Sequence, residues 1–351
     1  MSRTLDSMLV CPAPLANLDI VELAHGGGGL KTAALVERLF APAFRNPHLE
    51  PLGDGAIVTV GRERLAFTTD SFVVKPAFFP GGDIGSLAVH GTVNDLAMCG
   101  AEPLFLSAGY LLEEGFPMRD LERVVASMAA ACAASGVLLV TGDTKVVDRG
   151  KGDGLYVNTS GIGRVRDGVH VGPGRAAPGD VVIVSGPVGD HGIAVMAARE
   201  GIDFETALVS DSAPVIGPVR ALLDAVPTSH VLRDPTRGGL ATALCEIALA
   251  SKVGIWLEER DVPVREEVRA ACELLGFDPL YVACEGRFLA IVPGASREAA
   301  LAAIGSQPGG EGARSIGTVR AEDAGRVVLR TQIGSHRLLE RLSGEQLPRI
   351  C

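Results

Sequence analysis

Residues 118–141 read MRDLERVVASMAAACAASGVLLVT, and this stretch decides the fold class. Apolar residues between Leu121 and Met128 recur at the three-to-four spacing of one helix face, which predicts a helix at 118–135. Gly136 is a typical helix stop. The apolar run 137–141 follows directly and predicts a short buried strand. A helix that leads straight into a strand indicates a mixed α/β domain.

The same alternation of strands and helices extends in both directions along the chain. Further strands are predicted at 56–60, 65–69, 104–108, 155–165, 181–185, 253–257, 288–292, 315–319 and 327–329, and further helices at 86–98, 192–199, 215–225, 239–250 and 264–275. Residues 167–180 are rich in Gly and Pro, as interdomain connections often are. We therefore expect an N-terminal segment at 1–44, α/β domains at 45–168 and 169–336, and a flexible C-terminal tail at 337–351.

The composition excludes several classes of partner. Of 351 residues, 32 are Lys or Arg and 42 are Asp or Glu, so the net charge of −10 gives no bulk attraction for nucleic acid. The longest apolar stretch, 128–140, is shorter than the roughly 20 residues that a membrane helix needs, so no membrane partner is expected. Seven cysteines without a Cys-x-x-Cys pair predict reduced thiols and a cytoplasmic protein.

Five aspartates stand in short segments with Gly, Thr or Asn near predicted strand ends. They are Asp54, Asp70, Asp95, Asp143 and Asp234. Any one aspartate beside a glycine more often forms a turn or a helix cap. Magnesium, however, prefers a few carboxylates together with substrate phosphates. Five such residues in one chain favour a metal–phosphate site.

Glycine-rich segments supply candidate phosphate sites. Gly26, Gly27, Gly28 and Gly29 precede Leu30 and Lys31, an order that fails the Walker pattern. Their backbone N–H groups could approach a phosphate, although the spacing alone favours a hinge.

Two further segments open predicted helices, whose first N–H groups are free to bind an anion. These are Asp190-His191-Gly192, and Thr236 with Arg237-Gly238-Gly239. A capping aspartate beside a surface histidine explains the first segment equally well. A solvated cluster of Arg233, Asp234 and Arg237 equally explains the second.

Three residues are candidates for the chemistry itself. Lys145 and Glu285 would each be a base if buried, and an ordinary exposed charge otherwise. Cys351 is the last residue of the sequence, so it is either an inert terminal thiol or a covalent carrier arm. The other six cysteines are expected to be small buried hydrophobes.

Several motifs resemble one known family. They are TDS at 69–71, FFPGGDIG at 78–85, VNDLA at 93–97, GDTKVV at 142–147, SGPVGDHG at 185–192, RDPTRGG at 233–239 and PRIC at 348–351. From about residue 20 to its end, the chain resembles the HypE family of hydrogenase maturation proteins, which are carbamoyl dehydratases. The internal motifs are shared in part with aminoimidazole ribonucleotide synthetase, selenophosphate synthetase and thiamine-monophosphate kinase. The PRIC end is specific to the HypE family.

The resemblance implies a two-domain fold of the aminoimidazole ribonucleotide synthetase type. The N-terminal sheets of two subunits would pair into a dimer barrel, with ATP near the interface and the loop 26–29 closing over its phosphates. ATP and Mg²⁺ would be held by the acidic residues Asp54, Asp70, Asp95 and Asp143, and the residue pattern adds Asp234 as a fifth candidate metal ligand. The other candidate ATP-binding residues are Lys31, beside the glycine loop, and, within the matching motifs, Asp143, Thr144, Asp190, His191, Gly192, Thr236, Arg237, Gly238 and Gly239.

The resemblance also implies an activity. Cys351 would receive a carbamoyl group from the carbamoyltransferase HypF, and ATP would phosphorylate the carboxamide oxygen. Loss of phosphate would leave a thiocyanate, whose nitrile passes to iron on a HypC–HypD scaffold. Lys145 and Glu285 are the candidate bases. Two alternatives stay open: a kinase or synthetase of the same superfamily acting on a free small molecule, and a non-catalytic maturation scaffold.

Overall fold

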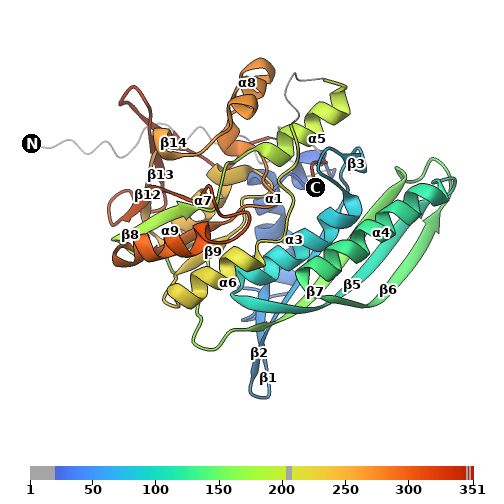
Figure 1. Ribbon diagram of the computed structural model, residues 1–351, viewed down its shortest axis with the longest axis horizontal. Coiled ribbons are helices and arrows are strands. Elements are labelled where there is room, and N and C mark those ends of the chain that lie inside the picture. Colours follow the sequence, from blue (N-terminus) through green and yellow to red (C-terminus); the bar gives the residue numbers. More distant parts are fainter. Residues whose placement is uncertain (1–19, 203–207, 345–346, 348) are drawn as a thin grey trace, which may run out of the picture.

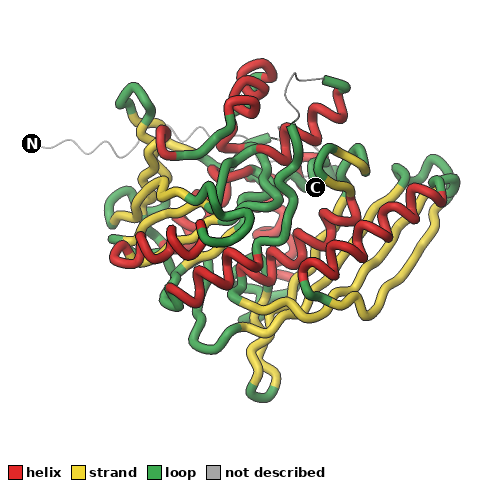
Figure 2. The backbone as a smooth tube through the Cα atoms, viewed as in Figure 1, coloured by secondary structure: helices red, strands yellow, loops and turns green. Residues whose placement is uncertain are grey.

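Two mixed β-sheets form the frame of the protein in a computed structural model, which describes residues 20–202, 208–344, 347 and 349–351 (Figure 1). Residues 166–179 connect the two sheets without a helix or strand (Figure 2). The N-terminal part carries short helices: η1 Leu23–His25, α1 Leu30–Leu35, η2 Val36–Phe40 and α2 Ala41–Ala43. The expected two α/β parts are therefore present.

The first sheet has the strand order β1-β2-β7-β5-β6 among the described residues. Its strands are β1 Ala56–Val60, β2 Glu63–Phe72, β5 Ala101–Glu113, β6 Leu138–Val147 and β7 Leu155–Val165. The β5–β6 pair is parallel and the other pairs are antiparallel. Gly61, at φ +63°, allows the tight turn that joins β1 and β2 as an antiparallel hairpin. A separate small ribbon joins β3 Phe78–Phe79 to β4 Gly82–Asp83.

Helices α3 Ile84–Met98 and α4 Met118–Ser135 lie along one face of this sheet (Figure 1). Asp83 caps α3, because its Oδ1 accepts from the backbone N–H groups of Gly85 at 2.7 Å and Ser86 at 3.0 Å. A Cβ at Gly85 would lie 2.4 Å from the carbonyl oxygen of Val124, so this glycine lets the two helices pack closely. Gly136 ends α4 at φ +70°, as predicted.

The second sheet has the order β14-β13-β10-β12-β8-β11-β9. Its strands are β8 Asp180–Val184, β9 Val231–Arg233, β10 Gly254–Glu258, β11 Leu289–Pro293, β12 Arg314–Arg320, β13 Val327–Arg330 and β14 His336–Leu339. The helices of this part are α5 Asp190–Glu200, α6 Ile216–Ala225, α7 Gly239–Ser251, α8 Glu266–Leu275 and α9 Arg297–Gly305, with short turns η3 Glu259–Asp261, η4 Pro279–Tyr281 and η5 Gly294–Ser296.

The end of α3 joins the two parts. Ala97 and Met98 pack in one apolar cluster with Val219 and Leu222 of α6. Helix α3 is buried along nearly its whole length, so its polar residues Asn94 and Asp95 lie inside the protein. Such buried polar groups need partners, and this places the candidate site at the junction of the two parts.

The structure corrects two expectations about packing. The strand expected to be buried at 137–141 belongs to β6, which is the edge strand (Figure 1). Only Val137 is buried there, while Leu138 is 64% exposed and Val140 is 58% exposed, because no strand of the described residues pairs with the outer edge of β6. The tail expected to be flexible is docked instead, and Ile350 is 3% exposed.

The structure also adds elements that the sequence patterns missed: α9, the β3–β4 ribbon, β9 and β14. β14 pairs with β13 and carries the second sheet past residue 336, the expected boundary of the tail. Its first three residues are exposed, so the strand has little apolar signal.

Candidate functional site

Three carboxylates from distant parts of the chain converge at the junction. Asp54 precedes β1, Asp95 lies on α3 and Asp234 follows β9. Each offers an oxygen, and these oxygens all lie within 4.8 Å of one another. Asp70 of β2 lies near enough to raise the pKa of Asp95 further. Four of the five predicted metal ligands are therefore neighbours.

The electrostatics of this cluster are those of carboxylates removed from water. Burial is the main cause that raises the pKa of Asp54 to about 6 and of Asp234 to about 8, and neighbouring acids add to it. The pKa of Asp95 is also raised well above its ordinary value, first by burial and then by Asp70. A divalent cation among these oxygens would offset the repulsion, and oxygen donors are what Mg²⁺ prefers.

Two side chains hold the cluster in place. The Thr68 hydroxyl donates to Oδ2 of Asp95 at 2.6 Å. Arg233 Nη1 lies 2.6 Å from Oδ1 of Asp54, and its Nη2 lies 2.8 Å from Oε2 of Glu246 on α7. Arg233 therefore forms a partly buried pair with Asp54 rather than a solvated cluster with Asp234. Thr68 and Glu246 carry no motif signal, because their role depends on contacts between distant segments.

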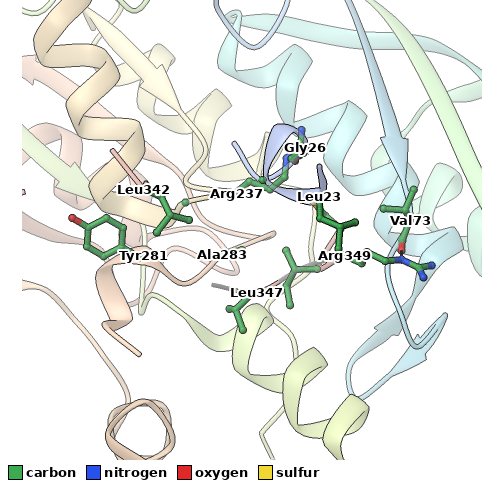
Figure 3. Close-up of a pocket in the computed structure, with 13 residues that line it drawn as sticks. Leu23, Gly26, Val73, Arg237, Tyr281, Ala283, Leu342, Leu347 and Arg349 are labelled. Atoms are coloured by element: carbon green, nitrogen blue, oxygen red, sulfur yellow. Dashed lines mark hydrogen bonds between the residues drawn. The ribbon is translucent and has the colours of Figure 1, made fainter. Parts of the chain in front are cut away.

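The carboxylates open on a cavity of about 960 Å³, large enough for a nucleotide. Its lining includes Gly28, Thr32, Asp54, Asp70, Asp95, Asp234, Thr236, Arg237, Glu285 and Cys351. Cys351 thus shares one cavity with the carboxylates, although it belongs to the far end of the sequence. A smaller cavity of about 150 Å³ lies on another side of the tail, with Gly26, Val73, Arg237 and Leu347 around it (Figure 3).

The last residues of the chain are docked beside the end of β2, with Arg349 in a left-handed backbone conformation at φ +52°. Lys75 donates its backbone N–H to the oxygen of Arg349 at 3.2 Å, and Arg349 Nε donates to the oxygen of Val73 at 3.0 Å. The Arg349 guanidinium also pairs with Asp153. Ile350 fills an apolar cluster that includes Phe79. In Figure 1 the C-terminus lies between α5 and β3.

Burial controls the ionisation of the groups around the sulfur. It raises the pKa of the Cys351 thiol to about 12, although the nearby Arg237 guanidinium opposes the shift. Glu285 is 4% exposed, its Oε1 has no hydrogen-bond partner among the described residues, and burial raises its pKa well above the ordinary value. A carboxylate that is desolvated and unpaired is a strong proton acceptor.

The glycine loop lies against the docked tail and Arg237. A Cβ at Gly28 would lie 2.7 Å from Cβ of Arg237, and φ there is +75°. The backbone N–H of Leu30 donates to the oxygen of Leu342 at 2.8 Å. Lys31 pairs with Glu22 near the surface. The loop therefore adjoins both cavities, and Gly28 and Thr32 face the larger one.

Several other predicted site residues lie outside the larger cavity. Asp143, Thr144 and Lys145 are exposed on β6, where Lys145 Nζ lies 2.7 Å from Oδ2 of Asp143, and none of the three lines either cavity. Gly238 lines the smaller cavity, and the N–H of Gly239 donates to Thr236 at 2.9 Å.

The Asp190-His191-Gly192 segment faces neighbouring loops and the tail. Asp190 pairs with Arg265 at 3.1 Å, and the N–H of Gly192 donates to Ala283 at 3.1 Å. A Cβ at Gly192 would lie 3.1 Å from Leu347, so the tail approaches this helix closely. The five cysteines other than Cys351 among the described residues are buried, as expected, and Cys11 lies outside the described residues.

Within the parts of the chain that the structure covers, no helix combines the length and hydropathy of a bilayer span. Family models match both halves: AIR synthase related protein, N-terminal domain, at residues 52–165, and AIR synthase related protein, C-terminal domain, at residues 177–330. The chain is 53% identical over 331 residues to carbamoyl dehydratase HypE of Azotobacter vinelandii, covering 94% of this chain and 97% of that protein.

Solved structures agree with this similarity. The crystal structure of a HypE–HypF complex matches at 47% identity with a TM-score of 0.84, covering 88% of this chain and 100% of that one. The crystal structure of HypE in complex with ATP matches at 49% identity with a TM-score of 0.80, covering 95% of this chain and 100% of that one.

Proposed function

The chain belongs to the HypE family of carbamoyl dehydratases, and from this premise we propose that its own Cys351 carries the group that it dehydrates. The family activity is ATP-dependent and serves hydrogenase maturation, by supplying the cyanide ligand of the active-site iron. An S-carboxamide on Cys351 would thereby become a thiocyanate. One observation carries the proposal: Cys351 opens on the cavity that holds the carboxylate cluster.

ATP would occupy the 960 Å³ cavity, with its phosphates toward the aspartates and the glycine loop 26–29. We propose that Asp54, Asp95 and Asp234, with Asp70 beside them, hold Mg²⁺ there. Their mutual distances and raised pKa values fit a cation, since Arg233 offsets the repulsion among these carboxylates only in part. Bound Mg²⁺ would neutralise charge on the transferred phosphoryl group. Arg237 and Thr236 would contact phosphate oxygens.

The chemistry balances with one ATP for each nitrile. The carboxamide oxygen attacks the γ-phosphorus and ADP leaves. This phosphorylation is needed because an amide oxygen is a poor leaving group until it carries a phosphate. Both protons then leave the nitrogen, the carbon–oxygen bond breaks, and phosphate departs with the oxygen. The product is a sulfur-bound nitrile. Glu285 would accept a proton, since it is buried, unpaired and faces the same cavity.

Lys145 remains the second candidate base, together with Asp143 and Thr144 as nucleotide ligands. All three lie on the exposed edge strand β6. They would reach a nucleotide if β6 of one protomer lay against the cavity of another. A homodimer that pairs the β6 edges would also cover Leu138 and Val140, which are exposed apolar residues.

Partners follow from the two ends of the reaction. A carbamoyltransferase must load Cys351, and HypF takes this role since a HypE–HypF complex is known for a close relative. The nitrile then needs an iron-bearing acceptor, for which we propose the HypC–HypD scaffold. Loading requires Cys351 as a free thiol, and the reducing cytoplasm keeps thiols free. We assign 1–44 to an N-terminal segment with the glycine loop and 45–168 to ATP binding and dimerisation. We assign 169–339 to the second domain, because β14 ends at Leu339, and the residues after it to the substrate tail.

Intact-mass measurement tests this proposal. The full chain is incubated with HypF and its carbamoyl donor, and then with ATP and Mg²⁺. The expected result is one carbamoyl adduct on Cys351 that loses one water only after ATP is added. An adduct on another cysteine, or no loss of water with ATP, contradicts it. A synthetase acting on a free small molecule would keep its ATP turnover in Cys351→Ser.

A further inference from the structure

One face of α5 contacts the docked tail. His191 Nε2 lies 2.8 Å from the oxygen of Ile350, and Arg199 Nη2 donates to the oxygen of Arg349 at 2.7 Å. Between them, Val195 packs in the same apolar cluster as Ile350. Residues four apart share one face of a helix, so His191, Val195 and Arg199 form a single row. This row satisfies two backbone carbonyls next to the reacting cysteine.

The hydrogen bonds around His191 fix where its proton lies. Ser210 Oγ accepts from the backbone N–H of Ser212 at 3.0 Å, and it lies 2.7 Å from His191 Nδ1. The Ser210 hydroxyl hydrogen is therefore free to donate to Nδ1. The ring proton is then on Nε2, where it donates to Ile350. The ring is fully buried and Phe79 meets it edge-on, with 5.5 Å between the ring centroids.

We propose that His191, oriented by Ser210, is a positioning residue for the dehydration: it holds the Ile350 carbonyl so that Cys351 faces the carboxylate cavity. This inference rests on the proposed function, since it takes Cys351 as the carrier of the carboxamide. It also gives His191 a different role from the nucleotide contact expected from the sequence.

The segment behind His191 is itself well fixed. The backbone N–H of Ser210 donates to Pro80 at 2.8 Å, and a Cβ at Gly81 would lie 2.9 Å from Ser210. The next residue, Asp211, accepts from the backbone N–H of Glu285 at 3.0 Å. Two adjacent residues thus orient the anchor of the tail and the candidate base. Ser210 and Asp211 therefore fix the substrate tail and the candidate base relative to each other, and such a fixed geometry favours reaction between them.

The test compares His191→Leu, His191→Gln and Ser210→Ala in the full chain, with Ser229→Ala as the matched control. Ser229 is buried and bonds only locally, to Val226 at 2.7 Å. Two rates are measured on each protein. One is alkylation of Cys351 by iodoacetamide, which reports how often the tail leaves its site. The other is single-turnover conversion of the S-carboxamide to thiocyanate after loading by HypF.

We expect His191→Leu to alkylate at Cys351 about 10- to 100-fold faster and to convert the carboxamide slower by a similar factor, because the buried Ile350 carbonyl loses its donor. His191→Gln should recover most of both rates, since its amide N–H can replace Nε2–H. Ser210→Ala should show a partial loss, because the ring proton can then move to Nδ1. ATP binding and the Ser229→Ala protein should match the wild type.

Unchanged alkylation and conversion in His191→Leu would overturn the inference, provided the wild type converts. A loss in His191→Gln as large as in His191→Leu would also overturn it, because packing rather than the hydrogen bond would then be responsible. Cys272 and Cys284 are buried nearby and serve as internal controls for unfolding. If the wild type itself forms no thiocyanate, the proposed function fails instead, and the alkylation series still decides whether His191 holds the tail.

Discussion

The backbone N–H of Val73 donates to the main-chain oxygen of Cys351 at 3.0 Å, directly after strand β2 ends at Phe72. The tail is thereby held by main-chain hydrogen bonds from Val73 and Lys75, which follow the strand. Backbone contacts of this kind do not depend on what the sulfur carries. The tail can therefore dock in the same way whether Cys351 is a free thiol, an S-carboxamide or a thiocyanate.

Replacing Asp95 by Asn should reduce ATP turnover about 100-fold or more while the protein stays folded, because the proposed metal site loses a charged ligand. Thr68 still has an oxygen to bond at this position. ATPase rates and the far-UV circular dichroism spectrum check this. Asp167→Asn, at an exposed position, is the control, and equal turnover in both variants would remove Asp95 from the site.

Without metal, the protein should lose stability as the pH rises from about 4 to about 8. Burial raises the pKa of Asp234 to about 8 from an ordinary value near 4, so its stabilising contribution is complete below the ordinary pKa and disappears through the raised one. Calorimetric Tm values in EDTA across this range check the slope. Asp234→Asn should flatten it, and Mg²⁺ should raise the Tm at pH 8 in the wild type alone. A slope that is the same in both proteins contradicts the assignment.

Glu285→Gln should stop the reaction after loading. HypF would still carbamoylate Cys351, but conversion to thiocyanate should fall about 100-fold or more, because an amide does not accept the nitrogen protons. Intact mass after addition of ATP and Mg²⁺ measures the fraction converted. Glu37→Gln, an exposed residue at the rim of the same cavity, should behave as the wild type. Normal conversion in Glu285→Gln would leave Lys145 as the base to test.

Leu138→Glu should prevent the proposed pairing of β6 edges, since a buried charge in each protomer would face its counterpart. Analytical ultracentrifugation should show monomers where the wild type shows dimers. Leu274→Glu places the same charge at a residue of α8 that is 72% exposed, and it should leave the oligomeric state unchanged. Dimers that persist in Leu138→Glu would place the interface elsewhere.

Local patterns predicted the fold well where one face of an element is buried. Helix α4 and strand β7 match their predicted bounds, because their apolar spacing is regular and glycine ends the helix. The strand β6 shows the limit of this approach: its apolar residues indicate burial, but the sequence alone does not show that no strand lies beyond it. β14 was not predicted, because its exposed residues show no alternation of apolar and polar side chains.

The site could be predicted in its residue types but not in its contacts. Asp54, Asp95 and Asp234 attract notice as aspartates in short polar segments, although Asp95 lies inside helix α3 and not at a strand end. Only the packing of α3 against both sheets brings the three together. His191 shows the same limit. Its place at a helix start suggests a phosphate contact, whereas its partner Ile350 lies 159 residues further along the chain.

The raised pKa of the docked Cys351 has a consequence for damage by oxidants. Peroxide attacks thiolates, and a thiol whose pKa is about 12 holds its proton at neutral pH. The inward position is therefore also a protected resting place, from which the sulfur cannot easily become a sulfenic acid. Peroxide should therefore oxidise Cys351 mainly in molecules whose C-terminal tail has left its docked position to be loaded with the carbamoyl group.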